Sequence, residues 1–364
     1  MLFSPEAHEL LAEEPWSAER ARAAIAAIVA DAESAFDDGW SLHPEDADPG
    51  DDPATRFRTI YIGGAGVVDA LQRLTQRGFV EPRRDYVPYL ERSLEAAPDF
   101  PDENPQRSLW MGETGIRLVL QRLAPSQANL ERLAGLIEPV HQDERCELMW
   151  GGPGTILAGR ELGLDVTPSV EWLRAQREPD GLWTQRLAGR NTRYVGPAHG
   201  FAGCALALGD DFSETLRRLA VEEDGLVNWP PVADRPLDAN GDGLIRTQWC
   251  HGAPGMVATL GRLLDEELAV AGGELTWRAG PLRKGAGLCH GTAGNGYAFL
   301  ALLERTGDER WLTRARAFAM HAARQVEHTR AKHGRGRYTL WTGDVGTALY
   351  LADCIDGGGE LPIP

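Results

Sequence analysis

Apolar residues recur along this chain at helical spacing, in short runs that each follow a pair of glycines. In residues 67–74 and 297–303, large apolar side chains fall three and four positions apart, which places them on one face of a helix. More polar amphipathic stretches, such as residues 18–36 and 311–326, lie between these runs and present one solvated face. Alternating β-branched residues are scarce. The pattern therefore predicts an all-α protein.

The glycine pairs mark an internal repeat. Each pair has the form Gly-x-x-Gly, and successive first glycines are 39 to 52 residues apart. One such pair is weak evidence, but seven at this spacing indicate a true repeat. The pairs are Gly63/Gly66, Gly112/Gly115, Gly151/Gly154, Gly200/Gly203, Gly252/Gly255, Gly291/Gly294 and Gly343/Gly346. Each repeat is predicted to be a hairpin of an outer, charged helix and an inner, apolar helix.

Two helices cannot bury their inner face alone, so the seven hairpins must stack on one another. They are expected to close into a double α/α toroid, an (α/α)7 barrel that forms a single domain over residues 1–364; an open superhelix is the alternative. The glycines favour closure because they let helix starts approach closely. Since every pair precedes an inner helix, the pairs should gather at one end of the barrel, here called the mouth.

Two Cys-His-Gly triplets, 39 residues apart, occupy the same register in neighbouring repeats. Cys250 and Cys289 lie two residues before the first glycine of their pairs, where the start of a helix favours the thiolate form. Two thiolates and one imidazole suit zinc, and a catalytic zinc site keeps a fourth position open for substrate. His290 is the preferred third ligand, with His251 as the competitor, because spacing alone does not choose between them.

His199 has the same register but no cysteine before it. It is predicted to face the same cavity as an imidazole without a metal, which suits proton transfer near neutral pH. The remaining cysteines, Cys146, Cys204 and Cys354, fall outside this register and are expected in the core. The remaining histidines fall in loops or outer helices and are expected at the surface: His8, His43, His141, His321, His328 and His333.

The composition of the chain excludes some classes of binding partner. A net charge of −17 argues against nucleic acid and anionic lipid as ligands. The chain has no apolar run of about eighteen residues and no signal-like start, so no membrane association and a cytoplasmic location are expected. Residues 238–243 imitate the start of a calcium loop, but Trp249 stands where a bidentate Glu is needed, so a turn is predicted. The tail after Asp356 is expected to fray.

With these motifs the chain resembles the LanC-like family, the lanthionine synthetase C-like proteins. The resemblance runs through all seven repeats and is most specific in residues 249–255 and 284–295. The sequence of these two segments is closer to that of free-standing glutathione-binding members than to that of antibiotic cyclases. It implies a double seven-helix toroid. It also implies zinc held by Cys250, Cys289 and His290, and an acid/base role for His199.

The resemblance implies four further cavity residues. Arg246 lies four residues before the first cysteine, where cyclases have an arginine. His251 stands where some cyclases have tyrosine and glutathione-binding members have histidine. Glu147 replaces an aspartate of the cyclases with a longer side chain. Lys284 matches a lysine that contacts glutathione.

Together these features predict a zinc-dependent enzyme that adds a thiol to dehydroalanine or dehydrobutyrine residues of a peptide or protein and so forms thioethers. Glutathione is the favoured thiol and co-substrate. One alternative is a lanthipeptide cyclase that works with a separate dehydratase. Another is a zinc- and glutathione-binding sensor or scaffold without catalysis. Zinc-dependent prenyl transfer lacks support, since diphosphate binding would need several basic residues at the mouth.

Overall fold

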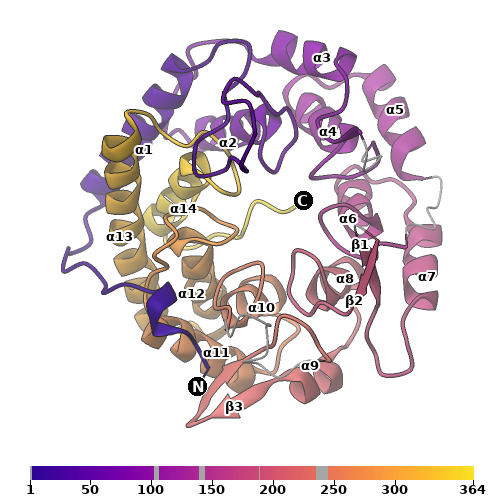
Figure 1. The fold of residues 1–364 in the computed structure, drawn as a ribbon, viewed down its shortest axis with the longest axis vertical. Helices are drawn as coiled ribbons and strands as arrows, with labels where there is room; N and C mark the ends of the chain where they lie inside the picture. Colours follow the sequence, from indigo (N-terminus) through magenta and orange to yellow (C-terminus); the bar gives the residue numbers. More distant parts are fainter. Residues whose placement is uncertain (1, 102–105, 139–143, 188, 235–244) are drawn as a thin grey trace.

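The computed structural model describes residues 2–101, 106–138, 144–187, 189–234 and 245–364. Within these residues, fourteen α-helices alternate between an outer and an inner ring (Figure 1). The outer helices are α1 (Ala18–Ser34), α3 (Val87–Glu95), α5 (Gln127–Ile137), α7 (Thr167–Ala175), α9 (Ser213–Leu219), α11 (Glu266–Ala279) and α13 (Glu309–His333). The inner helices are α2 (Gly64–Gln76), α4 (Glu113–Leu123), α6 (Gly152–Glu161), α8 (Phe201–Leu208), α10 (Ala253–Leu260), α12 (Thr292–Thr306) and α14 (Asp344–Asp356). The predicted double α/α toroid of seven hairpins is confirmed.

Each inner helix begins directly after the first glycine of a pair, and that glycine is its N-cap residue. At Gly252 the φ angle of 102° requires glycine. The second glycines allow neighbouring hairpins to approach: a Cβ on Gly66 would lie 2.9 Å from Cβ of Leu340. Because Gly66 belongs to the first hairpin and Leu340 to the last, this contact closes the ring, and α14 packs against both α1 and α2.

Five of the residues two positions before the first glycines are joined by backbone hydrogen bonds along the mouth. The amide of Trp341 donates to the carbonyl of Tyr61 at 3.4 Å, and the amide of Tyr61 donates to the carbonyl of Trp110 at 3.1 Å. In the same run, the amide of Cys250 donates to the carbonyl of Cys289 at 3.1 Å. The amide of Cys289 donates to the carbonyl of Trp341 at 2.7 Å. One register position therefore brings residues from distant repeats side by side.

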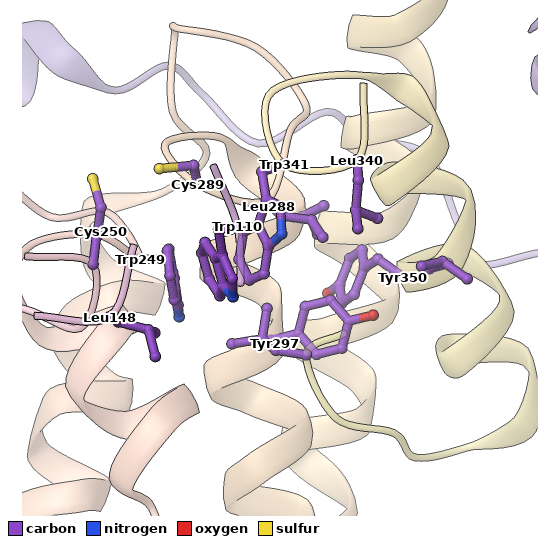
Figure 2. Packing of buried hydrophobic residues seen from close by; sticks show 14 of the residues in the cluster. Trp110, Leu148, Trp249, Cys250, Leu288, Cys289, Tyr297, Leu340, Trp341 and Tyr350 are labelled. Atoms are coloured by element: carbon purple, nitrogen blue, oxygen red, sulfur yellow. The ribbon is translucent and has the colours of Figure 1, made fainter. Parts of the chain in front are cut away.

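The interior of the barrel below the mouth is filled by three tryptophans. The ring centroids of Trp110 and Trp341 are 4.3 Å apart, and those of Trp249 and Trp341 are 4.5 Å apart. All three side chains are fully buried. Figure 2 shows the sulfur atoms of Cys250 and Cys289 on the mouth side of these stacked rings. The cysteines therefore lie against a layer of buried apolar side chains rather than in an open channel.

Short β-strands occur between some of the helices. They form two antiparallel pairs, β1 (Gln185–Leu187) with β2 (Arg190–Thr192) and β3 (Val221–Glu223) with β4 (Leu226–Asn228). None of the helices in the described ranges combines the length and the apolar character needed to cross a bilayer. His141 and the calcium-like residues 238–243 lie outside the described residues, so their predicted roles stay predictions.

Two sequence expectations are wrong. His8, His43 and His321 are buried rather than exposed. His8 and His321 are buried because the segment before α1 packs across α13 and the loop after α11, and His43, in the loop after α1, packs against His333 of α13. For example, Nδ1 of His8 lies 2.8 Å from the carbonyl oxygen of Gly280. The C-terminal tail does not fray along its whole length, since Leu361 is only 7% exposed and belongs to the core.

Candidate active site

The structure brings Cys250, Cys289 and His290 together at the mouth. They are held by the segments that lead into α10 and α12, and one ligand-type atom from each lies within 4.8 Å of the others. Both cysteines are buried, and His290 is partly exposed. A tetrahedral zinc ion takes sulfur at about 2.3 Å and nitrogen at about 2.0 Å, so one ion is within reach of all three atoms. The donor set therefore fits zinc with one position left for another ligand.

The two thiols are not equivalent. A hydrogen bond from the Cys289 thiol lowers the pKa of Cys250, and a hydrogen bond from His290 lowers it further, against the opposing effect of burial. The side-chain amide of Gln248 also donates to Sγ of Cys250, at 2.9 Å. Several donors thus converge on one sulfur. This environment stabilises the thiolate, which is the form that binds metal.

His199 forms a pair with Glu147 beside these ligands. Nδ1 of His199 lies 2.9 Å from Oε2 of Glu147. Glu147 is fully buried and also accepts hydrogen bonds from the backbone amides of Met149, at 3.1 Å, and Trp150. Burial lowers the pKa of His199, but the hydrogen bond and the charge of Glu147 outweigh it, so the net pKa is raised. Among the described residues Nε2 of His199 has no hydrogen-bond partner, which leaves it available for proton transfer.

His251 lies near His199, on the other side of a tyrosine. The ring centroid of Tyr194 is 6.1 Å from that of His199 and 6.0 Å from that of His251. Nδ1 of His251 is buried and has no hydrogen-bond partner in the described part of the chain. Burial lowers the pKa of His251 to about 4, and the charges of His199, Arg246 and Lys284 act in the same direction. His251 is therefore a neutral imidazole, and both cationic side chains are close enough to affect it.

Sequence reasoning missed three neighbours of the site. Tyr61 occupies the register position of the two cysteines in the first repeat, and its hydroxyl hydrogen-bonds the sulfur of Cys289. That shared register was the available signal. Tyr194 and Gln248 had none, because their roles depend on how the preceding loops fold back over the mouth.

Residues 58–361 match the family of lanthionine synthetase C-like proteins. The chain belongs to the LanC-like family. It is 34% identical over 176 residues to glutathione S-transferase LANCL1 of Danio rerio, covering 44% of this chain and 43% of that protein. It is 31% identical over 185 residues to LanC-like protein GCL1 of Arabidopsis thaliana, covering 45% and 41%. The chain thus spans less than half the length of these two curated relatives.

Among solved structures, this LanC-like chain is similar to a nisin cyclase. The two share 16% sequence identity and a TM-score of 0.47, and the match covers 83% of this chain and 94% of the cyclase chain.

The other cysteines of this LanC-like chain lie in the core, as predicted. Cys146, Cys204 and Cys354 are all buried, and the thiol of Cys204 donates to the carbonyl of Cys146 at 3.0 Å. Burial raises the pKa of both Cys204 and Cys354. They therefore remain protonated thiols, in contrast to Cys250.

Proposed function

We propose that this LanC-like protein adds a thiol to the β-carbon of dehydroalanine or dehydrobutyrine residues in peptides or proteins, with glutathione as the preferred thiol. The observation that carries the proposal is the convergence of Cys250, Cys289 and His290 within 4.8 Å at the mouth, beside the paired His199 and Glu147. Glutathione is favoured because one relative is named a glutathione S-transferase. The five cysteines, none in a disulfide, suit a reducing compartment such as the cytoplasm.

Zinc is the proposed cofactor, and Cys250, Cys289 and His290 are its proposed ligands. When bound, the ion would supply a Lewis acid that keeps an incoming thiol deprotonated, although a free thiol has a pKa of about 8.5. With three protein ligands, the fourth position is left for that thiol. His251 is assigned to the cavity rather than to the metal, because His290 and not His251 belongs to the group within 4.8 Å.

The chain's own residues then account for the proton transfer. As the thiol sulfur bonds to the β-carbon, the double bond opens and negative charge develops on the α-carbon and its carbonyl group. His199 donates a proton to the α-carbon, and Glu147 orients the ring and favours its protonated form. The proton lost by the thiol returns the imidazole to its starting state. The sum is addition of S–H across a carbon–carbon double bond, without any redox change.

The remaining predicted residues position the reactants in this proposal. Arg246 and Lys284 are cations near His251, where they can pair with carboxylates of glutathione or polarise a peptide carbonyl. His251 offers a neutral imidazole whose buried Nδ1 lacks a partner among the described residues. An unpaired buried polar atom is costly, so a bound substrate that pairs with it gains affinity.

The test is to incubate the purified protein with glutathione and a peptide that contains dehydroalanine, and to follow the peptide by mass spectrometry. The proposal predicts a gain of one glutathione per dehydroalanine that disappears after chelation and returns with zinc. Zinc and glutathione binding without an adduct would favour the sensor or scaffold instead. Ring closure in a peptide that also carries cysteine, with no glutathione transfer, would favour the cyclase.

A further inference from the structure

A second polar cavity, of about 530 Å³, opens beside the mouth. It lies between the segment before α1, the loop at residues 283–285 and one face of α13, and we term it the α13 cleft. Four cationic and two anionic side chains line it. They are Arg283, Lys284, Arg324 and Lys332, with Glu9 and Glu45.

Both carboxylates of the α13 cleft already have partners. Oε1 of Glu9 lies 2.7 Å from Nε2 of His321 and accepts a hydrogen bond from Gln325 at 2.8 Å. Glu45 accepts a hydrogen bond from Lys332 at 3.1 Å. These pairs belong to the walls of the cleft. The charge of Glu9 also interacts with that of Arg283, but neither carboxylate forms an ion pair with Lys284 or Arg324 in the described part of the chain. The four cations outnumber the two carboxylates, so these six side chains carry a net positive charge.

Two of the remaining cations lack acidic partners in the described part of the chain. Lys284 and Arg324 are exposed, and neither has a carboxylate partner among the described residues. Arg283 donates to the backbone carbonyls of Glu6, at 3.2 Å, and His8, at 2.8 Å, so it keeps its positive charge. On a protein of net charge −17, such a cleft is an unusual place where an anionic ligand is attracted rather than repelled.

The α13 cleft adjoins the proposed zinc ligands. Lys284 lies five residues before Cys289 in the chain. The carbonyl of Gly285 accepts a hydrogen bond from the amide of Thr292 at 2.9 Å, which folds this loop onto the start of α12. The charge of Lys284 accordingly acts on both Cys289 and His251. A ligand held in the cleft would therefore reach the mouth at Lys284.

The cleft has the length of a peptide segment. Arg324 and Lys332 are eight residues apart on α13, which at 1.5 Å per residue is about 12 Å along the helix axis. His328 lies midway on the same helix and also lines the cleft. An extended chain covers this distance in about four residues. Leu10 is 94% exposed at the edge of the cleft and offers an apolar contact for an aliphatic side chain.

We infer that the α13 cleft binds an acidic stretch of the peptide or protein substrate, next to the dehydroamino acid in its sequence. Arg324 pairs with a side-chain carboxylate of that stretch, Lys284 stays available for glutathione where the cleft meets the mouth, and the reactive residue enters the mouth. The inference rests on the proposed function for the identity of the substrate. The inference goes further in one respect: the enzyme prefers substrates with negatively charged residues beside the reactive residue.

The test uses two fluorescent peptides in which alanine replaces the dehydroamino acid, so that neither can react. One has a flank of four glutamates and the other a flank of four glutamines. By fluorescence anisotropy at low salt, the protein is expected to bind the acidic peptide about tenfold more tightly, and added salt should shrink that preference. Equal affinities for the two peptides would overturn the inference.

Three variants test whether the preference for the acidic peptide depends on Arg324. Arg324→Glu is expected to remove the preference for the acidic peptide, whereas Arg324→Lys should largely keep it. Arg190→Glu is the matched control, since Arg190 is an exposed arginine on β2, across the ring from α13 (Figure 1). A preference that survives Arg324→Glu, or that is lost equally in Arg190→Glu, would contradict the assignment.

A competition arm separates the peptide from glutathione, which also carries carboxylates. Saturating glutathione should leave the acidic peptide bound. Complete displacement would assign the cleft to glutathione and overturn the inference. Because these peptides cannot react, their binding does not depend on catalysis. A protein that prefers the acidic peptide but forms no thioether would refute the proposed function alone.

Discussion

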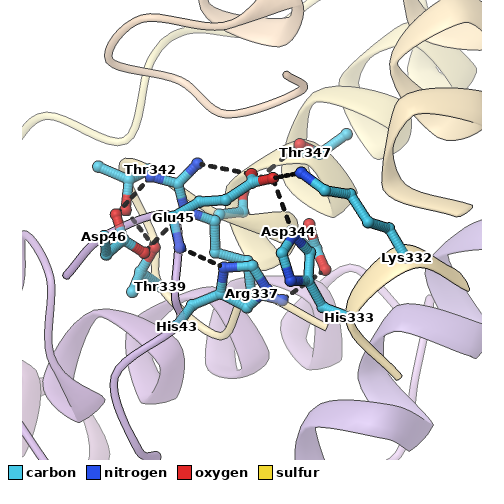
Figure 3. Close-up of polar contacts among 11 residues, drawn as sticks. His43, Glu45, Asp46, Lys332, His333, Arg337, Thr339, Thr342, Asp344 and Thr347 are labelled. Atoms are coloured by element: carbon cyan, nitrogen blue, oxygen red, sulfur yellow. Dashed lines mark hydrogen bonds and ion pairs between the residues drawn. The ribbon is translucent and has the colours of Figure 1, made fainter. Parts of the chain in front are cut away.

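Two polar regions of the mouth are built from the same repeat, but their side chains differ in whether they pair with one another. At the starts of α10 and α12, Cys250, Cys289 and His290 converge without any carboxylate or cation among them. Close by, Nδ1 of His251 is buried without a partner in the described residues. At the start of α14, by contrast, the arginine, carboxylate and threonine side chains pair with one another (Figure 3), although Nε2 of His43 is also buried without a partner in the described residues.

In the cluster at α14, the charged side chains are hydrogen-bonded to one another. The guanidinium of Arg337 makes two hydrogen bonds to the carboxylate of Asp46, one of them at 2.7 Å, and Arg337 and Asp46 are nearly inaccessible to solvent. The hydroxyl oxygens of Thr339 and Thr342 lie 2.7 Å apart, and Asp344 accepts a hydrogen bond from the amide of Arg337 at 2.9 Å. Thr342 holds the register position that is His251 or His290 in the other region. This cluster fixes the loop around Asp46, and its charged groups are paired with one another rather than grouped as metal-binding donors.

The difference teaches that the fold repeats but the chemistry does not. Seven similar helix starts place side chains around one mouth, and in the part of the chain that the structure describes the one group of three metal-binding donors lies at the starts of α10 and α12. Two thiols and an imidazole form a donor set that suits zinc, whereas the arginine and carboxylate at α14 neutralise each other. Four substitutions test whether the region at α10 and α12 serves the chemistry and the region at α14 serves stability.

The largest effect is expected from Cys289→Ala. Two protein ligands remain after this change, too few to hold zinc, so the protein should lose the metal and thioether formation should fall to background. Elemental analysis together with the glutathione transfer assay measures both. Cys354→Ala, which removes a buried thiol far from the mouth register, is the matched control and should keep zinc. Stoichiometric zinc in Cys289→Ala would count heavily against the site.

His199→Ala should keep zinc and lose turnover. Removal of a general acid typically lowers the rate by roughly 10²- to 10⁴-fold, and the loss here should lie in kcat, because His199 is not a proposed metal ligand. Steady-state kinetics with parallel metal analysis checks this. Unaltered turnover would exclude His199 from the mechanism.

Glu147→Gln should have a smaller, pH-dependent effect. The carboxylate raises the pKa of His199, so His199 stays protonated, and active as an acid, to higher pH than it otherwise would. Loss of the charge lowers that pKa, so the fall in kcat on the alkaline side should move to lower pH. The expected loss is about tenfold above neutral pH and little below it. A profile that keeps its shape and position would show that Glu147 does not set the protonation of His199.

Arg337→Met should have the smallest effect on chemistry and its main effect on stability. It leaves the buried carboxylate of Asp46 unpaired, which is expected to lower the free energy of unfolding by about 3–5 kcal/mol. Denaturant titration measures this loss, and Asp46→Asn in the same background should recover part of it. Zinc content and turnover of the folded protein should be unchanged; a loss of zinc would mean that the two regions are not separate.

The parts of the fold set by local pattern were predictable from the sequence. The first glycines, such as Gly291, cap the inner helices, and their register alone placed Cys250 and Cys289 side by side. What depends on long-range packing was not predictable. His321 is buried because a segment some 300 residues away, including Glu9, packs onto it.

In the candidate site, too, some features follow from local sequence pattern and others depend on packing between distant segments. The register predicted that His199 faces the mouth, but its orientation comes from Glu147, 52 residues earlier, and only the resemblance to the LanC-like family pointed to that residue. The hydrogen bond from Gln248 to Cys250 depends on a tight local bend, in which the amide of His251 donates to the carbonyl of Gln248 at 3.1 Å. No spacing rule in the sequence encodes such a bend.

The most direct test is X-ray absorption at the zinc edge of the purified wild-type protein, recorded with and without glutathione. The account predicts one zinc per chain, with two sulfur ligands at about 2.3 Å and one histidine nitrogen, and a third sulfur when glutathione is added. A protein without stoichiometric zinc, or a zinc already held by four protein ligands whose spectrum glutathione does not change, would contradict it.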